Sequence, residues 1–406
     1  MDGQINAEQN YRKYMEEQIL PAILPRREEL YLSREPGRKL YCAFYTADET
    51  VPAKGILLIS HGFTETADKY FEVICYFLKA GFHVCIPEHC GHGRSYRLVN
   101  GVSSPAHTVP AAHRKKSGEI AACEGDLSLV HVDSWKRYIA DLRFIAQAAK
   151  KYYAQKSILS SASLPLFLFA HSMGGGIGAA LVARDPGLFE RVILCSPMIC
   201  PATGGVPMPV TQLIDAALCA SGHECEYVIG QHAYNRKETF DEAFATSHAR
   251  WAWYKAKTDA KPLFQTSGAS YGWLREAIRL NHFLMTVAWK QITVPILLFQ
   301  AENETVVSRE QQVMFLQKLA QARQSSKTVC QPPVFQKQNL QNRFSRDPVS
   351  SKAFSSFAAS SKSPILWPND IRFVRIPGAK HEIYRSEDET TTRFLKECLE
   401  FLLAEI

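Results

Sequence analysis

Short apolar runs recur along this chain and predict the strands of a buried sheet. The middle runs are continuously apolar, which is typical of strands covered on both faces of a parallel sheet. The runs are LYCAFYT (40–46), GILLIS (55–60), HVCIP (83–87), LFLFA (166–170), VILCSP (192–197), VPILLFQ (294–300) and IRFVRIP (371–377).

Apolar residues at helical spacing fill the stretches between these runs. Such patterns cover residues 67–81, 132–153, 309–321 and 390–406. Because strands and helices alternate, we expect an α/β fold built on a mostly parallel, doubly wound sheet.

Three stretches interrupt the alternation. Residues 96–131 form a long loop with the basic patch HRKK (113–116), residues 200–290 contain several helical patterns, and residues 323–368 are rich in Ser, Gln and Lys. The second stretch is long enough for a helical cap over the carboxyl edge of the sheet. The third has the composition of a disordered insertion.

These breaks divide the chain into segments with different expected roles. A core made of three parts can close across the cap and the insertion, because loop-closure entropy grows only slowly with loop length. The expected segments are an N-terminal extension (1–26), the first part of the core (27–199), the helical cap (200–290), the continued core (291–322), the disordered insertion (323–368) and the C-terminal core (369–406).

The bulk composition is that of a globular protein. A chain of 406 residues suits one large α/β domain with insertions, or two domains. The N-terminus is too polar for an ordinary signal peptide, and no apolar run reaches the roughly 18–20 residues of a membrane span. The 11 cysteines include no C-x-x-C pair. We therefore expect free thiols in a cytoplasmic compartment, with no metal site.

The net charge of +7 is concentrated in one place. Residues 321–369 carry seven Lys or Arg residues and one Asp, so this stretch accounts for +6 of the total. No basic helix with interleaved aromatic residues occurs, which argues against a nucleic-acid partner. The basic stretch is a candidate contact with an anionic membrane surface, and an inert solvated loop is the plain alternative.

The stretch AHSMGGG (170–176) directly follows a predicted strand. A serine between small residues is typical of a nucleophile elbow, a sharp strand-to-helix turn that exposes its central side chain. Here Ser172 lies between Ala170 and Gly174, and the following helix would point its positive N-terminal end at the serine. The alternative is a glycine-rich turn with an ordinary surface serine.

A serine nucleophile needs a base and an acid, which in this topology follow it in the order acid, then histidine. AENETVVS (301–308) offers two acids, Glu302 and Glu304, after a strand. The apolar pair that follows favours Glu304 at the strand-end turn, although both could be solvated. His381 lies in GAKHEIY after the last strand and is the predicted base.

Two backbone N–H groups are needed to stabilise an oxyanion. We expect them from Met173, directly after the serine, and from Phe63 in SHGFTE (60–65). His61 is a candidate for stabilising that loop and for lining the pocket. Three cap tryptophans are pocket candidates, with simple packing inside the cap as the alternative: Trp251, Trp253 and Trp273.

These motifs together resemble a known family. SHGFTETADKY, EHCGHGRS (88–95), AHSMGGG, LLFQAENETVV and GAKHEIY are similar to the successive signatures of the monoacylglycerol lipase-like α/β-hydrolases of the serine aminopeptidase S33 type. The likeness is closest to the bacterial-type lysophospholipase branch and covers most of residues 27–322 and 370–406. It departs from the family at Glu88 and Cys90, where Asp and Arg are usual.

The resemblance implies an α/β-hydrolase fold with a helical cap and without a cofactor. It implies Ser172, Glu304 and His381 as catalytic triad, with Phe63 and Met173 as oxyanion donors. The expected function is a serine ester hydrolase that takes one acyl chain from a small lipid, lysophospholipid first and monoacylglycerol second. A peptidase of the proline iminopeptidase type and a non-catalytic binding protein are the alternatives. The oligomeric state stays open.

Overall fold

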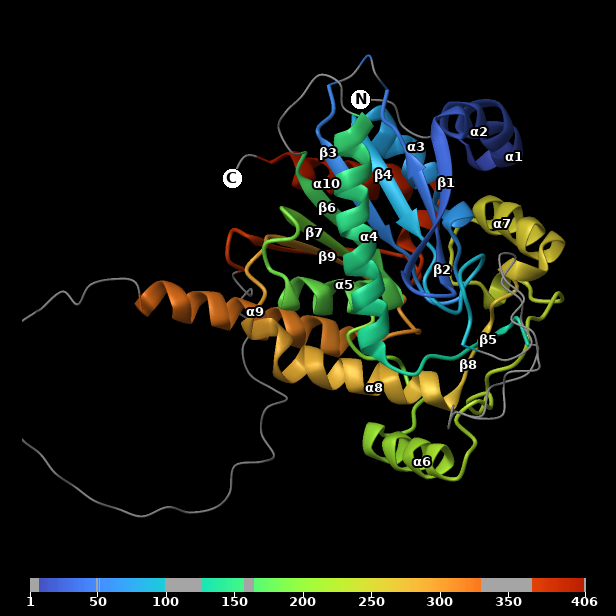
Figure 1. The fold of residues 1–406 in the computed structure, drawn as a ribbon, viewed down its shortest axis with the longest axis vertical. Coiled ribbons are helices and arrows are strands. Elements are labelled where there is room, and N and C mark those ends of the chain that lie inside the picture. Colours follow the sequence, from blue (N-terminus) through green and yellow to red (C-terminus); the bar gives the residue numbers. More distant parts are fainter. Residues whose placement is uncertain are drawn as a thin grey trace, which may run out of the picture.

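The computed structural model describes residues 7–48, 50, 52–98, 126–156, 164–329 and 367–404. Its centre is an eight-stranded sheet in the order β1–β2–β4–β3–β6–β7–β9–β10 (Figure 1). The bounds are β1 Arg27–Glu35, β2 Arg38–Tyr45, β3 Gly55–Ser60, β4 Phe82–Pro87, β6 Leu166–His171, β7 Arg191–Cys195, β9 Ile296–Ala301 and β10 Ile371–Ile376.

The sheet is parallel from β4 to β10, and β2 pairs antiparallel with both β1 and β4. The predicted mostly parallel, doubly wound α/β sheet is therefore confirmed. Strand β1 is missing from the prediction. Its sequence REELYLSRE is largely charged and half exposed, so this edge strand lacks the apolar run that marks the others.

Helices cover both faces of the sheet, which explains its apolar strands. Along β3, Ile56 and Leu58 face one core cluster while Leu57 and Ile59 face the other. The first cluster is covered by α4 Trp135–Lys156, α5 Ser172–Arg184, α8 Tyr271–Thr286 and α9 Arg309–Val329. The second is covered by α3 Phe71–Lys79, α10 Asp388–Leu403 and the short N-terminal helices α1 Tyr11–Tyr14 and α2 Leu20–Ile23.

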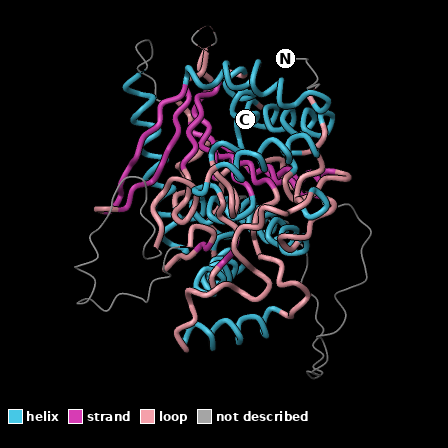
Figure 2. The backbone as a smooth tube through the Cα atoms, turned by 90° about the vertical axis from the view of Figure 1, so that its right-hand side faces the viewer, coloured by secondary structure: helices cyan, strands magenta, loops and turns pink. Residues whose placement is uncertain are grey.

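The segment predicted as a cap contains three α-helices: α6 Met208–Ala220, α7 His248–Ala260 and α8. Helix α6 lies at one end of the molecule (Figure 2) and contacts α8. Helix α8 contributes Leu280 and Leu284 to the main core. A short parallel pair, β5 Leu129–Val130 with β8 Gly268–Ala269, joins this segment to the loop before α4.

Helix α9 runs past its predicted end at residue 321, so the boundary drawn between 322 and 323 is wrong. No Gly or Pro interrupts the sequence before Pro332. The guanidinium of Arg323 also donates to the carbonyl of Val294 at 2.6 Å, which holds the helix against the sheet. Residues 330–366 of the predicted insertion and the HRKK patch (113–116) lie outside the described residues.

Two further sequence-based expectations concern cysteines and membranes. Seven of the nine cysteines within the described ranges are buried thiols, as expected. None of the described helices is both long and apolar enough to cross a bilayer.

Candidate active site

The turn after β6 has the geometry of a strained elbow. Ser172 begins α5 with a φ of +50°, a left-handed conformation that is unfavourable for a residue with a side chain. A Cβ on Gly174 would lie 2.2 Å from the carbonyl oxygen of Ser60. The elbow therefore requires glycine there, because the helix start and the end of β3 are in backbone contact.

A continuous chain of polar contacts starts at this serine. The Oγ of Ser172 lies 2.8 Å from Nε2 of His381, and Nδ1 of the same ring lies 2.7 Å from Oε2 of Glu304. The serine and the histidine are each only 4% exposed. The structure thus brings together three residues that are up to 209 positions apart in sequence.

The structure distinguishes the two candidate acids. Glu304 is buried, and its second oxygen accepts the N–H groups of Val306 at 2.8 Å and Val307 at 3.3 Å. Glu302 is exposed and accepts instead from the N–H of Gly378. Burial alone would raise the pKa of Glu304, but His381 and the two N–H donors outweigh it and hold this pKa below its usual value.

The predicted oxyanion donors follow two neighbouring strands, β3 and β6. The strand order reverses around β3, with β4 on one side and β6 on the other, and ligands of open α/β sheets bind at such a switch point. Phe63 follows β3 and Met173 follows Ser172. The N–H of Phe63 has no acceptor within the described part of the chain, and the first N–H groups of a helix are free of intrahelical bonds.

Glu65, whose role was not predicted from the sequence, fixes the loop that carries Phe63. This fully buried carboxylate accepts from the N–H of Gly62 at 2.6 Å and from Lys69 Nζ at 2.9 Å. The hydroxyls of Tyr70 and Tyr384 also donate to it, at 2.5 and 2.8 Å. The signal available in the sequence was the Glu–Lys spacing of four residues at the start of a helix.

Loss of the Glu65 charge should destabilise the protein in a pH-dependent way. Burial raises the pKa of Glu65, but Lys69, His171 and Tyr70 outweigh it and hold this pKa well below its usual value. The carboxylate therefore stabilises the fold above the unfolded pKa of about 4.3, and this contribution fades as the pH falls further.

We expect Glu65→Gln to lower the free energy of unfolding at pH 7 by roughly 3–5 kcal/mol, as for other broken buried ion pairs. Denaturant titrations at several pH values measure the difference from wild type, which should shrink below about pH 4.3. Glu16→Gln, in an exposed pair with Arg12, is the control and should change little. A difference that stays constant down to pH 3 would contradict this role.

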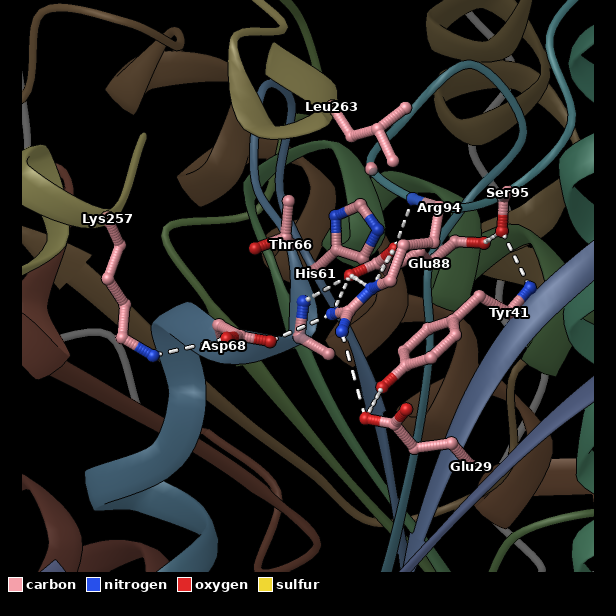
Figure 3. A network of polar contacts seen from close by, with 12 residues as sticks. Glu29, Tyr41, His61, Thr66, Asp68, Glu88, Arg94, Ser95, Lys257 and Leu263 are labelled. Atoms are coloured by element: carbon pink, nitrogen blue, oxygen red, sulfur yellow. Dashed lines mark hydrogen bonds and ion pairs between the residues drawn. The ribbon is translucent and has the colours of Figure 1, made fainter. Parts of the chain in front are cut away.

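The unusual Glu88 also has a structural role (Figure 3). Its buried carboxylate accepts from the N–H groups of Ala67 at 3.1 Å and Arg94 at 2.6 Å. Arg94 contacts Asp68 at 2.8 Å, and Asp68 contacts Lys257 of α7 at 3.2 Å. The network ties the loop after β4 to the start of α3 and to the cap.

The structure places the three predicted pocket tryptophans in different surroundings. Trp273 packs its ring against Phe63, with centroids 4.4 Å apart. Trp251 lines a cleft under the cap. Trp253 does not line this cleft. It lies two residues further along α7 and therefore on the opposite face of the helix, where its ring packs against Tyr11 with centroids 6.2 Å apart. Trp253 therefore faces away from the cleft under the cap.

The prediction that His61 lines the pocket is also wrong, because the side chain is completely buried. Its Nδ1 lies 2.7 Å from the carbonyl oxygen of Gly62, and its Nε2 accepts from the N–H of His89 at 2.8 Å. Both ring nitrogens are thus engaged with backbone, which fits its other predicted role of stabilising the loop.

Two spaces are lined by chain neighbours of the serine and the histidine, one by Met173 and the other by Glu382. An apolar slot of about 10 Å³ is lined by Trp135, Tyr138, Met173, Met198, Trp273 and Leu280, so its own side chains fill it. A polar cleft of about 270 Å³ lies beneath the cap and includes Phe244, Trp251 and Glu382. Within the described ranges, no cluster of three or more His, Cys, Asp or Glu side chains could hold a metal ion.

Known proteins share parts of this sequence. Lysophospholipase L2 of Escherichia coli is 26% identical over 252 residues, which are 62% of this chain and 64% of that protein. The match thus spans less than two thirds of the relative. Human monoglyceride lipase is 24% identical over 179 residues, 44% of this chain and 46% of that protein.

Solved structures share the fold. A soluble variant of monoglyceride lipase from Saccharomyces cerevisiae superposes with a TM-score of 0.61 at 15% identity, covering 93% of this chain and 95% of that one. A carboxyl esterase from Bacillus coagulans gives the same TM-score and identity, covering 93% and 97%. The family model described as serine aminopeptidase, S33, matches residues 51–331. The chain therefore belongs to the serine aminopeptidase S33 family of α/β-hydrolases.

Proposed function

We propose that this protein is a serine ester hydrolase that removes one acyl chain from a lysophospholipid or a monoacylglycerol. The observation that carries this proposal is the chain of contacts from Ser172 through His381 to Glu304, with separations of 2.8 and 2.7 Å. A strained elbow presents the serine, and a buried acid lies behind the histidine. This is the arrangement that turns a weakly nucleophilic hydroxyl into an attacking group.

In the proposed mechanism, His381 takes the hydroxyl proton of Ser172 at Nε2 while Oγ attacks the ester carbonyl. Glu304 accepts from Nδ1, which orients the ring and stabilises the imidazolium. The N–H groups of Met173 and Phe63 bind the oxyanion, supported by the positive end of α5. His381 then protonates the leaving alcohol, and water releases the acyl group in a second round of the same steps.

The lipid part of the proposal rests on the relatives and on the apolar slot beside Met173. The relatives are named lysophospholipase and monoglyceride lipase. An acyl chain bound at the slot would displace side chains such as Trp273, because the slot has almost no free volume of its own. A peptidase of the same family remains the second candidate, and a non-catalytic role is disfavoured by the intact contact chain.

Replacing the acid should have a smaller effect than replacing the serine or the histidine. Glu304→Gln removes the charge that stabilises the imidazolium, and we expect kcat to fall by about 10²–10⁴-fold with a smaller change in KM. Glu302→Gln is the matched control two residues away and should keep near wild-type kcat. Initial rates on a soluble short-chain ester measure both. The assignment of the acid would be contradicted if Glu302→Gln lost most of its kcat while Glu304→Gln kept near wild-type kcat.

A substrate panel tests the reaction class. Purified protein should hydrolyse lysophospholipids, monoacylglycerols and short esters, and should leave aminoacyl and prolyl peptides intact. Ser172→Ala, assayed in parallel, removes background from contaminating esterases. Peptide turnover in preference to every ester would favour the peptidase.

A further inference from the structure

The polar cleft beneath the cap opens beside the candidate catalytic histidine. Phe244 lines the cleft, and its ring lies 6.4 Å from that of His381. Glu382, the next residue in the chain, is also part of the wall. A volume of about 270 Å³ is slightly below the roughly 300–1,000 Å³ of pockets for drug-sized ligands. The cleft thus suits one polar group of a substrate better than a whole lipid.

The cations in the cleft wall are already neutralised. Lys69 contacts Glu65 at 2.9 Å and Glu382 at 2.5 Å. Lys255 contacts Asp259 at 2.8 Å. Arg385, the third wall cation, contacts Glu382 at 2.5 Å. The wall therefore has little positive charge to offer an anion.

Glu238 differs from these paired groups. It lines the cleft and is partly buried, yet among the described residues its carboxylate has neither a hydrogen bond nor an ion pair. Burial raises the pKa of Glu238, and the nearby acids Glu382 and Glu242 add to this effect against Lys255 and Lys69. A bound cation would offset both the cost of burying the Glu238 carboxylate and its repulsion by the neighbouring acids.

Trp251 is an aromatic side chain of the same cleft wall. Three aromatic wall residues already have a lysine over the ring: Tyr234, Tyr254 and Phe264. Trp251 has no such cation among the residues that the structure describes. Tryptophan binds ammonium groups more strongly than the other aromatic residues do, and such faces recognise quaternary ammonium ligands.

We propose that this cleft binds the ammonium group of a zwitterionic lipid head group, with Glu238 as the counter-ion and Trp251 as the aromatic contact. The proposal rests on the proposed ester hydrolase and selects among its substrates. Lysophospholipids with a choline or ethanolamine head group should be preferred over monoacylglycerols, which carry no charge. An anionic head group without an ammonium should gain nothing from the cleft.

Kinetics on matched substrates test this selectivity. We compare kcat/KM for short-chain lysophosphatidylcholine, lysophosphatidylethanolamine, lysophosphatidylglycerol and monoacylglycerol of the same acyl length, all below their micellar concentrations. The choline-to-glycerol ratio is kcat/KM for lysophosphatidylcholine divided by kcat/KM for lysophosphatidylglycerol. Glu238→Gln should lower this ratio about tenfold, and Trp251→Leu should lower it as well. The ethanolamine lipid shows whether a primary ammonium is accepted equally.

Glu226→Gln is the control, because Glu226 is an exposed carboxylate of the cap that lies outside the cleft wall and contacts His223 at 2.7 Å. It should leave the choline-to-glycerol ratio unchanged. A wild-type enzyme without preference for the choline lipid, or a ratio that Glu238→Gln does not alter, would overturn the proposal.

Binding without turnover separates this proposal from the proposed function. Calorimetry with the Ser172→Ala protein should show phosphocholine binding more tightly than glycerol 3-phosphate. Adding Glu238→Gln should weaken phosphocholine binding about tenfold. Equal affinity for the two ligands would overturn the head-group site, whereas failure to cleave any ester would overturn only the hydrolase.

Discussion

Ser172→Ala should lower kcat on a soluble ester by about 10⁴–10⁶-fold, the loss typical of removing a triad nucleophile. The change deletes one oxygen atom at a position where Ala fits as well as Ser does. KM should change little, because the cleft and the slot keep their walls. Initial rates and far-ultraviolet circular dichroism of the same sample separate lost chemistry from lost fold.

Ser196→Ala is a closely matched control. Ser196 also follows a buried strand, has a φ of +42° and is itself buried. Its hydroxyl has no hydrogen-bond partner in the described part of the chain, so its removal should leave kcat near wild type. A less than tenfold loss in Ser172→Ala would mean that another residue attacks the ester.

His381→Ala should be as damaging as the loss of the serine, because the two residues act on one proton. The double variant Ser172→Ala, His381→Ala should therefore be no slower than either single variant, since losses within such a unit are not additive. The measurement is a double-mutant cycle in kcat on the same ester.

His223→Ala is the control for this substitution. His223 lies in an exposed part of the cap, where its Nδ1 is 2.7 Å from a carboxylate oxygen of Glu226. It should retain wild-type activity. If the effects of Ser172→Ala and His381→Ala multiplied in the double variant, the serine and the histidine would not share a proton.

The sheet and the candidate triad could be predicted because their signals are local. Each central strand is buried on both faces and therefore reads as an apolar run. The elbow needs small residues around Ser172, and Gly174 shows why, since its missing Cβ lets two backbones touch. The chain order of serine, acid and histidine then reduced the candidates to a few strand-end turns.

The errors arose where a structure depends on distant partners. Edge strand β1 is held by its pairing with β2 and carries little hydrophobic pattern. The role of Glu65 depends on Tyr384, which lies 319 residues away. Trp251 and Trp253 have the same local sequence context, and only the position of the N-terminal helices decides which of them faces the cleft.

The most direct test of the central claim is covalent capture of the nucleophile. The protein is incubated with a fluorophosphonate, digested, and mapped by mass spectrometry, with Ser172→Ala and His381→Ala alongside. We predict a single phosphonyl adduct on Ser172 in the wild type and a greatly slowed reaction in His381→Ala. An adduct on a different residue, or an unmodified Ser172 after prolonged incubation, would contradict the proposal that this serine forms the acyl-enzyme.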